Sequence, residues 1–163
     1  MIEHGLYIVK QEYFNLVDSL GGDIDKVNGT KRPVYCCIKD TLIDGLYWAI
    51  PTSDLSHRSE EQKRKIQAYI ALPEKDIRSS YYHIARTTRD AIFKVSSCYP
   101  ITEKYIDHEY TTSGKHVVIR RAETVLALEK KIKKILSVES RKNNYFPQHI
   151  TDIKNYLVSE LIA

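Results

Sequence analysis

The sequence predicts an α+β protein in which a compact, highly curved and mostly antiparallel β-sheet, barrel-like in shape, is combined with inserted and C-terminal helices. Two observations lead to this prediction. Short runs rich in β-branched and aromatic residues are bounded by turn signals, which is typical of antiparallel strands. Longer segments carry apolar residues three or four positions apart, which is typical of helices. Neither an internal repeat nor a low-complexity linker divides the chain, so we expect a single domain over residues 1–163.

The first predicted elements are a strand and a helix. An apolar run at residues 6–9 predicts the strand, and the pair Gly21-Gly22 marks the end of the helix that follows it. The apolar positions of this helix are Tyr13, Leu16, Val17 and Leu20. Residues 23–33 contain an Asn-Gly turn pair and end in Lys-Arg-Pro, so we expect an exposed basic loop there.

The next two strands are predicted to form a hairpin. Residues 34–38 and 46–50 are rich in β-forming residues, and Asp44-Gly45 directly before the second run is a strong hairpin signal. Pro51 lacks the N–H group that a central ladder requires, so we expect the second strand to end there. Residues 52–58 would then leave the sheet as a loop.

A capping box opens the next helix. Ser59 is followed three positions later by Gln62, which is the spacing at which the two residues satisfy each other's backbone N–H groups, and the helix is expected over residues 60–72. The rest of the chain predicts, in order, strands at 77–88 and 91–97, a short helix at 102–110 and a turn at 111–114. A long helix at 117–138 follows, with an apolar stripe of Val125, Leu128, Ile132 and Ile135. A final helix has Ile150, Ile153, Leu157 and Leu161 on its apolar face.

The composition excludes some classes of protein. The longest apolar runs have about five residues, far fewer than the roughly 20 that a membrane span needs, and the N-terminus lacks the pattern of an export signal. Cys36, Cys37 and Cys98 are odd in number and have no CxxC spacing, so we expect reduced thiols, a cytoplasmic location, and neither metal nor cofactor. A net charge of +4 together with 12 tyrosines suits a phosphate-rich partner if the basic residues cluster.

Chemically active side chains concentrate just after the predicted hairpin, where Thr52, Ser53, His57 and Arg58 lie within seven residues. His57 can shuttle protons near neutral pH, Arg58 can make charge-assisted hydrogen bonds to phosphate, and the N-terminus of the following helix can hold an anion. These groups suit metal-free cleavage of RNA, in which the neighbouring 2′-hydroxyl attacks the phosphate. The alternative interpretation is that the hydroxyls only cap the helix and that His57 and Arg58 are solvated.

The order of the elements adds a family resemblance. A Tyr-Ile-Val strand with its helix, a loop ending in Lys31-Arg32-Pro33, a strand at 34–38, and Tyr-Trp-Ala-Ile-Pro-Thr-Ser at 47–53 follow one another. This arrangement resembles the ToxN, AbiQ and CptN endoribonuclease toxins of type III toxin–antitoxin systems, and CptN most closely. The resemblance spans most of the chain in the order of elements, whereas its specific motif is short.

The resemblance implies a barrel-like fold related to the MazF and Kid toxins. It also implies a metal-independent endoribonuclease, acting in phage defence by abortive infection, that cleaves cellular mRNA and its own repetitive antitoxin RNA to 2′,3′-cyclic phosphate ends. A pseudoknot RNA antitoxin would inhibit the toxin within a closed protein–RNA hetero-oligomer.

The resemblance extends to individual residues. Thr52 and Ser53 match the hydroxyl pair of the family, and Arg32 falls where the family has a lysine. The family continues with Pro-Lys, whereas this chain has Asp54-Leu55, so the catalytic lysine has no direct match. We therefore expect His57 or Arg58 to replace it.

Further basic and aromatic residues are predicted to bind RNA, because lysine and arginine neutralise phosphates and aromatic rings stack on unpaired bases. They are Lys31, Arg32, Tyr35, Lys39, Tyr82, His83, Arg86, Arg89, Lys130 and Lys134. Two alternatives to the endoribonuclease stay open. In the first, the chain is a non-catalytic RNA-binding module, and in the second it is a scaffold whose basic helix binds an acidic protein.

Overall fold

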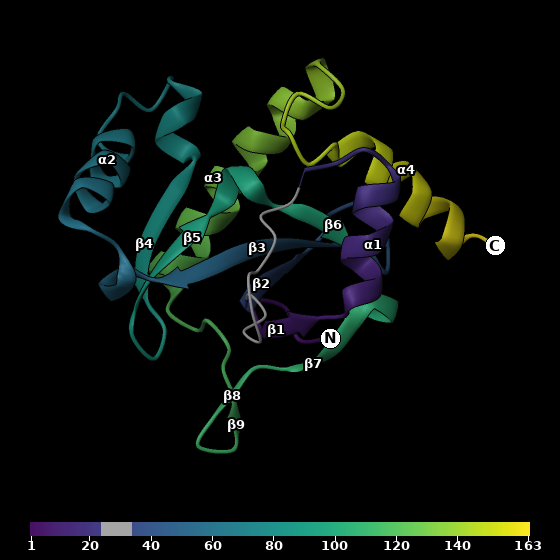
Figure 1. The fold of residues 1–163 in the computed structure, drawn as a ribbon, viewed down its shortest axis with the longest axis horizontal. Coiled ribbons are helices and arrows are strands. Elements are labelled where there is room, and N and C mark those ends of the chain that lie inside the picture. Colours follow the sequence, from purple (N-terminus) through teal and green to yellow (C-terminus); the bar gives the residue numbers. More distant parts are fainter. Residues whose placement is uncertain (24–33) are drawn as a thin grey trace.

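The computed structural model describes residues 1–23 and 34–163, and these residues form an α+β fold around a seven-stranded sheet (Figure 1). The strands are β1 (Leu6–Val9), β2 (Val34–Lys39), β3 (Tyr47–Asp54), β4 (Tyr82–Arg86), β5 (Asp90–Lys94), β6 (Tyr99–Ile101) and β7 (Ile106–Glu109). The α-helices of the described residues are α1 (Gln11–Ser19), α2 (Glu60–Ile70), α3 (Ala122–Arg141) and α4 (Ile150–Leu161). The predicted α+β class and the antiparallel pairing are confirmed.

The sheet is open rather than closed into a barrel. Its order is β4-β5-β3-β2-β1-β7, with β6 also paired to β3, so β4 and β7 are the two edges. After β7 the chain turns into a separate hairpin of β8 (Thr111–Thr112) and β9 (Lys115–His116), which leaves this edge without a further strand among the described residues. The expected barrel-like shape is therefore wrong, because the sheet does not close into a barrel.

The central strand β3 extends through Pro51, so the prediction that residues 52–58 form a loop is wrong for 52–54. On one side β3 pairs with β2 from Tyr47 to Thr52. On the other side β6 pairs with residues 47–49 and β5 with residues 52–54. Pro51 thus stands where the second ladder is interrupted, a position at which the missing N–H group costs no strand pairing.

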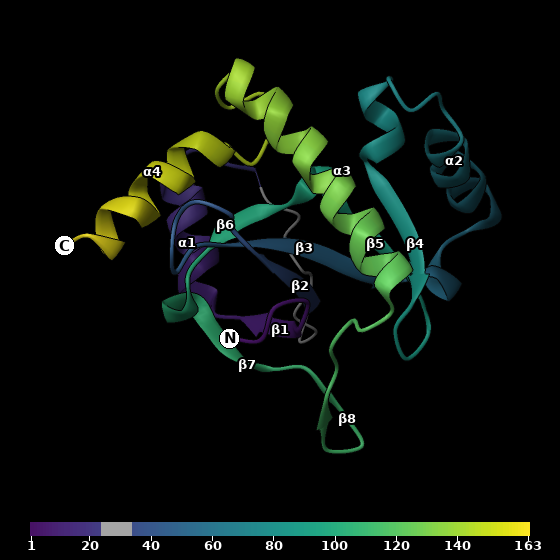
Figure 2. The same cartoon turned by 180° about the vertical axis from the view of Figure 1, so that it is seen from behind.

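Helices cover both faces of the sheet. Figure 2 shows α3 lying across one face, where its buried residues Leu128, Ile132 and Ile135 follow the predicted apolar stripe. In Figure 1, α1 lies over the opposite face. The Tyr13 ring of α1 contacts Tyr99 with ring centroids 6.2 Å apart, and its hydroxyl donates to the Pro100 carbonyl at 2.5 Å. None of the described helices combines the length and apolar character that a membrane span requires.

Several predicted boundaries shift because tertiary pairing overrides local pattern. The helix expected at 102–110 is wrong: a 3₁₀ turn at Glu103–Tyr105 leads into β7, which pairs with β1. The strand expected at 77–88 begins with a 3₁₀ turn at Ile77–Ser80, and the run at 91–97 ends in another at Val95–Ser97. The long helix predicted at 117–138 begins at Ala122 instead.

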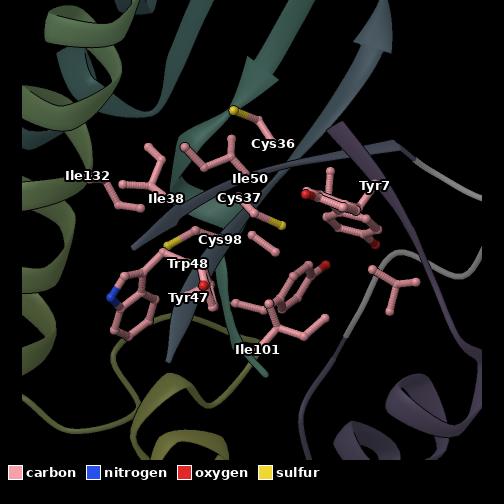
Figure 3. Close-up of a cluster of buried hydrophobic side chains, with 14 of the residues drawn as sticks. Tyr7, Cys36, Cys37, Ile38, Tyr47, Trp48, Ile50, Cys98, Ile101 and Ile132 are labelled. Carbon is pink, nitrogen blue, oxygen red and sulfur yellow. The ribbon is translucent and has the colours of Figure 1, made fainter. Parts of the chain in front are cut away.

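The three cysteines belong to the core (Figure 3). Cys36, Cys37 and Cys98 are free thiols and buried, as expected from their spacing. Cys36 pairs with Ile50 and Cys37 with Ala49 across the β2–β3 ladder, so neighbouring thiols point to opposite faces. Burial raises the pKa of Cys36 and of Cys98 to about 12, which keeps both thiols protonated and unreactive near neutral pH.

The packing of α3 is tested by two leucines two positions apart. Leu128 is fully buried, whereas Leu126 is 66% exposed. We expect Leu128→Ala to lower the free energy of unfolding by about 2–5 kcal/mol, because it leaves a cavity in the core. Leu126→Ala should change it by no more than about 0.5 kcal/mol. Urea unfolding of both variants measures the difference, and equal losses would contradict the described face of α3.

Candidate functional site

The C-terminal end of β3 brings Ser53 and Arg58 together. A 3₁₀ turn at Leu55–His57 follows the strand, with Asp54 as its cap. The Arg58 guanidinium then donates from Nη2 to Ser53 Oγ over 3.2 Å. Both side chains are partly buried. Since Ser53 accepts this hydrogen bond, its own hydroxyl hydrogen remains to be donated to a further acceptor.

Asp54 organises the charges around this contact. Its carboxylate accepts from the Ser56 hydroxyl at 2.7 Å and the Ser56 backbone N–H at 2.8 Å, and it pairs with Arg89 at 3.1 Å. The exposed His57 imidazole lies 4.0 Å from the same carboxylate. The two hydrogen bonds from Ser56 and the Arg89 guanidinium hold the pKa of Asp54 at about 2. Asp54 is therefore a fixed anion that orients cationic groups, and it holds no proton to transfer near neutral pH.

Thr52 lies on the other face of the sheet from Ser53. Successive side chains of a strand alternate between faces, and the register is regular here, with Thr52 opposite Phe93 and Ser53 opposite Ile92. The Thr52 hydroxyl donates to the Val34 carbonyl at 2.8 Å. The structure thus separates the two hydroxyls of the predicted pair, and Thr52 ties β3 to β2.

The N-terminus of α2 is already satisfied by its own sequence. The predicted capping box is present: Ser59 Oγ accepts from the Gln62 N–H at 3.2 Å, and Gln62 Oε1 accepts from the Ser59 N–H at 3.1 Å. Glu60 and Glu61 add two negative charges to the first turn. Both features oppose the anion site expected at this helix end.

On the face that carries Thr52, His83 meets a lysine of α3. Lys131 Nζ lies 3.2 Å from His83 Nδ1 and donates to the Tyr82 carbonyl at 2.8 Å. Burial, with the Lys131 charge as the second cause, lowers the pKa of His83 to about 4. Burial also lowers the pKa of Lys131. His83 is therefore neutral near pH 7, and Lys131 rather than a phosphate is its neighbour.

The predicted RNA-binding residues divide into groups. Tyr82 lies on the Ser53 face, and Arg86 and Arg89 follow it in the β4–β5 hairpin, where Arg86 pairs with Asp90 at 3.7 Å. Lys130 and Lys134 of α3 both pair with Glu74, whose single negative charge offsets part of their combined positive charge.

The remaining residues that were predicted to bind RNA are not shown to lie near Ser53 and Arg58. Tyr35 is 2% exposed and packs its ring on Phe14 and Tyr99. Lys39 pairs with Tyr47, six residues from Ser53 along β3 and so roughly 20 Å away. Lys31 and Arg32 lie outside the described residues, and Val34, the first described residue after them, pairs with Thr52.

One group of described residues has the composition of a metal site. Glu3, His4 and Glu129 place three potential ligand atoms within 4.8 Å of one another. Existing contacts account for this arrangement, because His4 Nε2 lies 3.0 Å from Glu129 Oε1 and Glu3 accepts from the Lys39 N–H at 2.9 Å. The group contacts neither Ser53 nor Arg58 through any of these bonds.

The sequence does not single out two of the residues that shape the site. Asp54 stands in the sequence as a departure from the family motif, although aspartate is a known turn residue because its side chain bonds to the backbone N–H two residues on. Lys131 meets His83 through the packing of α3 on β4, and no local spacing indicates that contact.

Neither a protein-family model nor a curated protein matches this sequence.

The charge network predicts a response of Asp54 to mutation. Ser56→Ala should raise the pKa of Asp54 from about 2 toward its ordinary value of 3.8, because the Ser56 hydroxyl is the largest cause of the lowering. Arg89→Ala should raise it by a smaller amount. The stability that Asp54 contributes is complete above its unfolded-state pKa and is lost as the pH falls toward 2. A carbon-detected NMR titration of the carboxyl group measures the pKa, and an unchanged value in Ser56→Ala would contradict the network.

His83 predicts a pH dependence of folding. Its pKa is about 4 in the folded chain and 6.5 ordinarily, so the unfolded state takes up the proton first and stability falls as the pH drops from 6.5 toward 4. His83→Gln removes this titration. Urea unfolding at pH 7 and pH 4.5 should show a smaller loss for the variant than for the wild type. Equal losses would mean that His83 is not shielded as described.

Proposed function

We propose that this chain is a metal-independent endoribonuclease toxin of a type III toxin–antitoxin system. The observation that carries the proposal is the 3.2 Å contact between Arg58 and Ser53 beside the Asp54–Arg89 pair. The Ser53 hydroxyl bonds to one guanidinium group, and a second guanidinium group is held by the neighbouring Asp54 carboxylate. A hydroxyl donor and guanidinium groups are suited to holding a phosphodiester without a metal. The sequence resemblance to the ToxN, AbiQ and CptN toxins adds support at one of these residues, Ser53, which matches the hydroxyl pair of that family.

In the proposed reaction, the 2′-oxygen of a ribose forms a bond to the adjacent phosphorus while the bond to the 5′-oxygen breaks. The products are a 2′,3′-cyclic phosphate and a 5′-hydroxyl. Arg58 and Arg89 stabilise the charge that develops on the phosphate oxygens, and Ser53 donates a hydrogen bond to one of them. His57, exposed beside Asp54, takes the proton from the 2′-hydroxyl, and the leaving 5′-oxygen takes a proton from solvent water. Thr52 positions the strand through its bond to Val34.

The biological setting belongs to the same proposal. The toxin would act in the cytoplasm on cellular mRNA and on its own repetitive antitoxin RNA. A pseudoknot of that RNA would inhibit it within a closed protein–RNA hetero-oligomer. The helix-covered antiparallel sheet is compatible with a distant relation to the MazF and Kid toxins. A tandem array of short repeats directly upstream of the coding region would support this setting.

Substitution at the Ser53–Arg58 contact tests the reaction. We expect Ser53→Ala and Arg58→Ala each to lower the rate of RNA cleavage by about 10²- to 10⁴-fold, because each removes a donor to the reacting phosphate. Gel analysis of RNA fragments, with mapping of the cyclic phosphate ends in the presence of a chelator, measures the rate and the product. Ser137→Ala, an exposed position on α3, serves as the control and should cleave like the wild type.

A second function is favoured by the separation of Thr52 from Ser53. Because the two hydroxyls lie on opposite faces, the chain is alternatively a non-catalytic RNA-binding module. Such a module would bind RNA with an affinity that falls as salt rises, would retain binding in Ser53→Ala and His57→Ala, and would yield no cyclic phosphate. If the wild type leaves RNA intact and is harmless when expressed, the enzyme proposal fails and the module remains.

A further inference from the structure

A groove lined by aromatic side chains opens beside the candidate site. Its volume is about 500 Å³, and it lies between α2, the start of β4, the turn before β6, and the segment at 145–148. Its aromatic lining consists of Tyr69, Tyr81, Tyr82, Tyr99, Tyr145 and Phe146. Lys65 of α2 is exposed at this groove, and Ser96 and Ser97 supply hydroxyls.

The groove and Ser53 share one face of the sheet. In the β4–β5 ladder, Tyr82 of β4 pairs with Lys94 of β5. Ile92, two residues before Lys94, pairs with Ser53 in the β3–β5 ladder on the other side of β5. Since residues two apart on a strand point to the same face, Tyr82 and Ser53 do so as well. From strand spacing, Tyr82 lies about 10 Å across and about 7 Å along the sheet from Ser53. Figure 1 looks onto this face, which α3 does not cover.

The walls of the groove are held in place by the fold. Tyr69 and Tyr82 are stacked, with ring centroids 5.9 Å apart and an interplanar angle of 25°. The buried Gln148 donates from Nε2 to the carbonyls of Ser96 and Cys98, both at 2.9 Å, and so ties the 145–148 wall to the turn before β6. Phe146 is buried against Tyr81, whereas Tyr145 is 45% exposed. The groove therefore requires little ordering before a ligand binds.

The lining matches one class of ligand. A nucleobase is flat, so its faces stack on aromatic rings, and its polar edge is met by hydroxyl and backbone groups. A lysine at the rim suits the phosphate attached to such a base. A paired base within a duplex does not expose its faces in this way, so the chemistry selects an unpaired base.

We propose that this groove binds an unpaired base of an RNA strand whose backbone crosses the Ser53–Arg58 contact. The inference rests on the proposed action on RNA, and adds to it a subsite that selects single-stranded over paired RNA. It also assigns Tyr82 and Tyr145 as stacking residues, and Tyr69 as the residue that positions Tyr82.

Matched tyrosine variants test the groove. Tyr145 and Tyr156 are similarly exposed, at 45% and 41%, but only Tyr145 lines the groove. In the full chain carrying Ser53→Ala, with a ten-nucleotide single-stranded RNA whose 2′-hydroxyls are methylated so that it cannot be cleaved, we expect Tyr145→Ala and Tyr82→Ala each to weaken binding by about 5- to 150-fold. Tyr82→Phe, which keeps the ring, and Tyr156→Ala should bind within about 2-fold of the parent. Fluorescence anisotropy measures the affinity.

A second salt concentration separates stacking from charge. The loss in Tyr82→Ala should persist at higher salt, because stacking does not depend on released counterions. Urea unfolding of each variant confirms that it is folded, and Tyr145→Ala, at an exposed position, keeps the test decisive if Tyr82→Ala unfolds. A duplex of the same sequence should bind more weakly than the single strand and should not respond to Tyr145→Ala.

The groove and the proposed function fail in different ways. Unchanged affinity in both Tyr145→Ala and Tyr82→Ala overturns the groove, whatever the cleavage assay shows. The absence of single-stranded RNA binding in the parent also overturns it. If the groove variants lose affinity but Ser53→Ala cleaves RNA like the wild type, the proposed catalytic role fails and the groove stands.

Discussion

The backbone ladder of β3 is the constraint on which the rest of the structure depends. It pairs with β2 along one side, and along the other side with β6 and then β5, so three neighbouring strands are held by one. The interruption of the second ladder at Pro51 lets the chain between β5 and β6 form a short turn without breaking the sheet. Because β3 runs on to Asp54, its end projects beyond the core and presents the site residues at the surface.

Alternation along that strand divides chemistry between two faces. Thr52 points toward the face covered by α3, where its hydroxyl is satisfied by the Val34 carbonyl and His83 is shielded by Lys131. Ser53 points to the face left uncovered by α3, together with Arg58 and the tyrosine-lined groove. Near the end of β3, one face is therefore packed against α3, while the other carries Ser53, Arg58 and the tyrosine-lined groove where we propose that RNA binds.

Charge placement follows the same division. Asp54 is held ionised by Ser56 and Arg89, and its negative charge offsets the charge of Arg89. The charge of Arg58 is not offset in this way, because Arg58 bonds to the neutral Ser53 hydroxyl. On α3, by contrast, Glu74 pairs with both Lys130 and Lys134. The modest net charge of +4 thus reflects pairing at both places: Lys130 and Lys134 share the Glu74 carboxylate, and Arg89 pairs with Asp54, whereas Arg58 bonds to the uncharged Ser53 hydroxyl.

Local interactions determined much of what the sequence alone predicted. The capping box of Ser59 and Gln62, the β2–β3 pairing and the apolar faces of α1, α3 and α4 depend on residues close together in the chain, so their spacing was sufficient. The candidate segment around Ser53 was also found in this way. The strand character of residues 52–54, the conversion of residues 106–109 into β7, and the meeting of His83 with Lys131 were decided only by the tertiary structure. Each of these features depends on contacts with an element that is distant in the sequence. Pairing with β5 keeps residues 52–54 in the sheet although Pro51 favours a strand end, and pairing with β1 makes residues 106–109 a strand although their local pattern favours a helix. The packing of α3 on β4 partly buries Lys131, although a lysine is usually solvated.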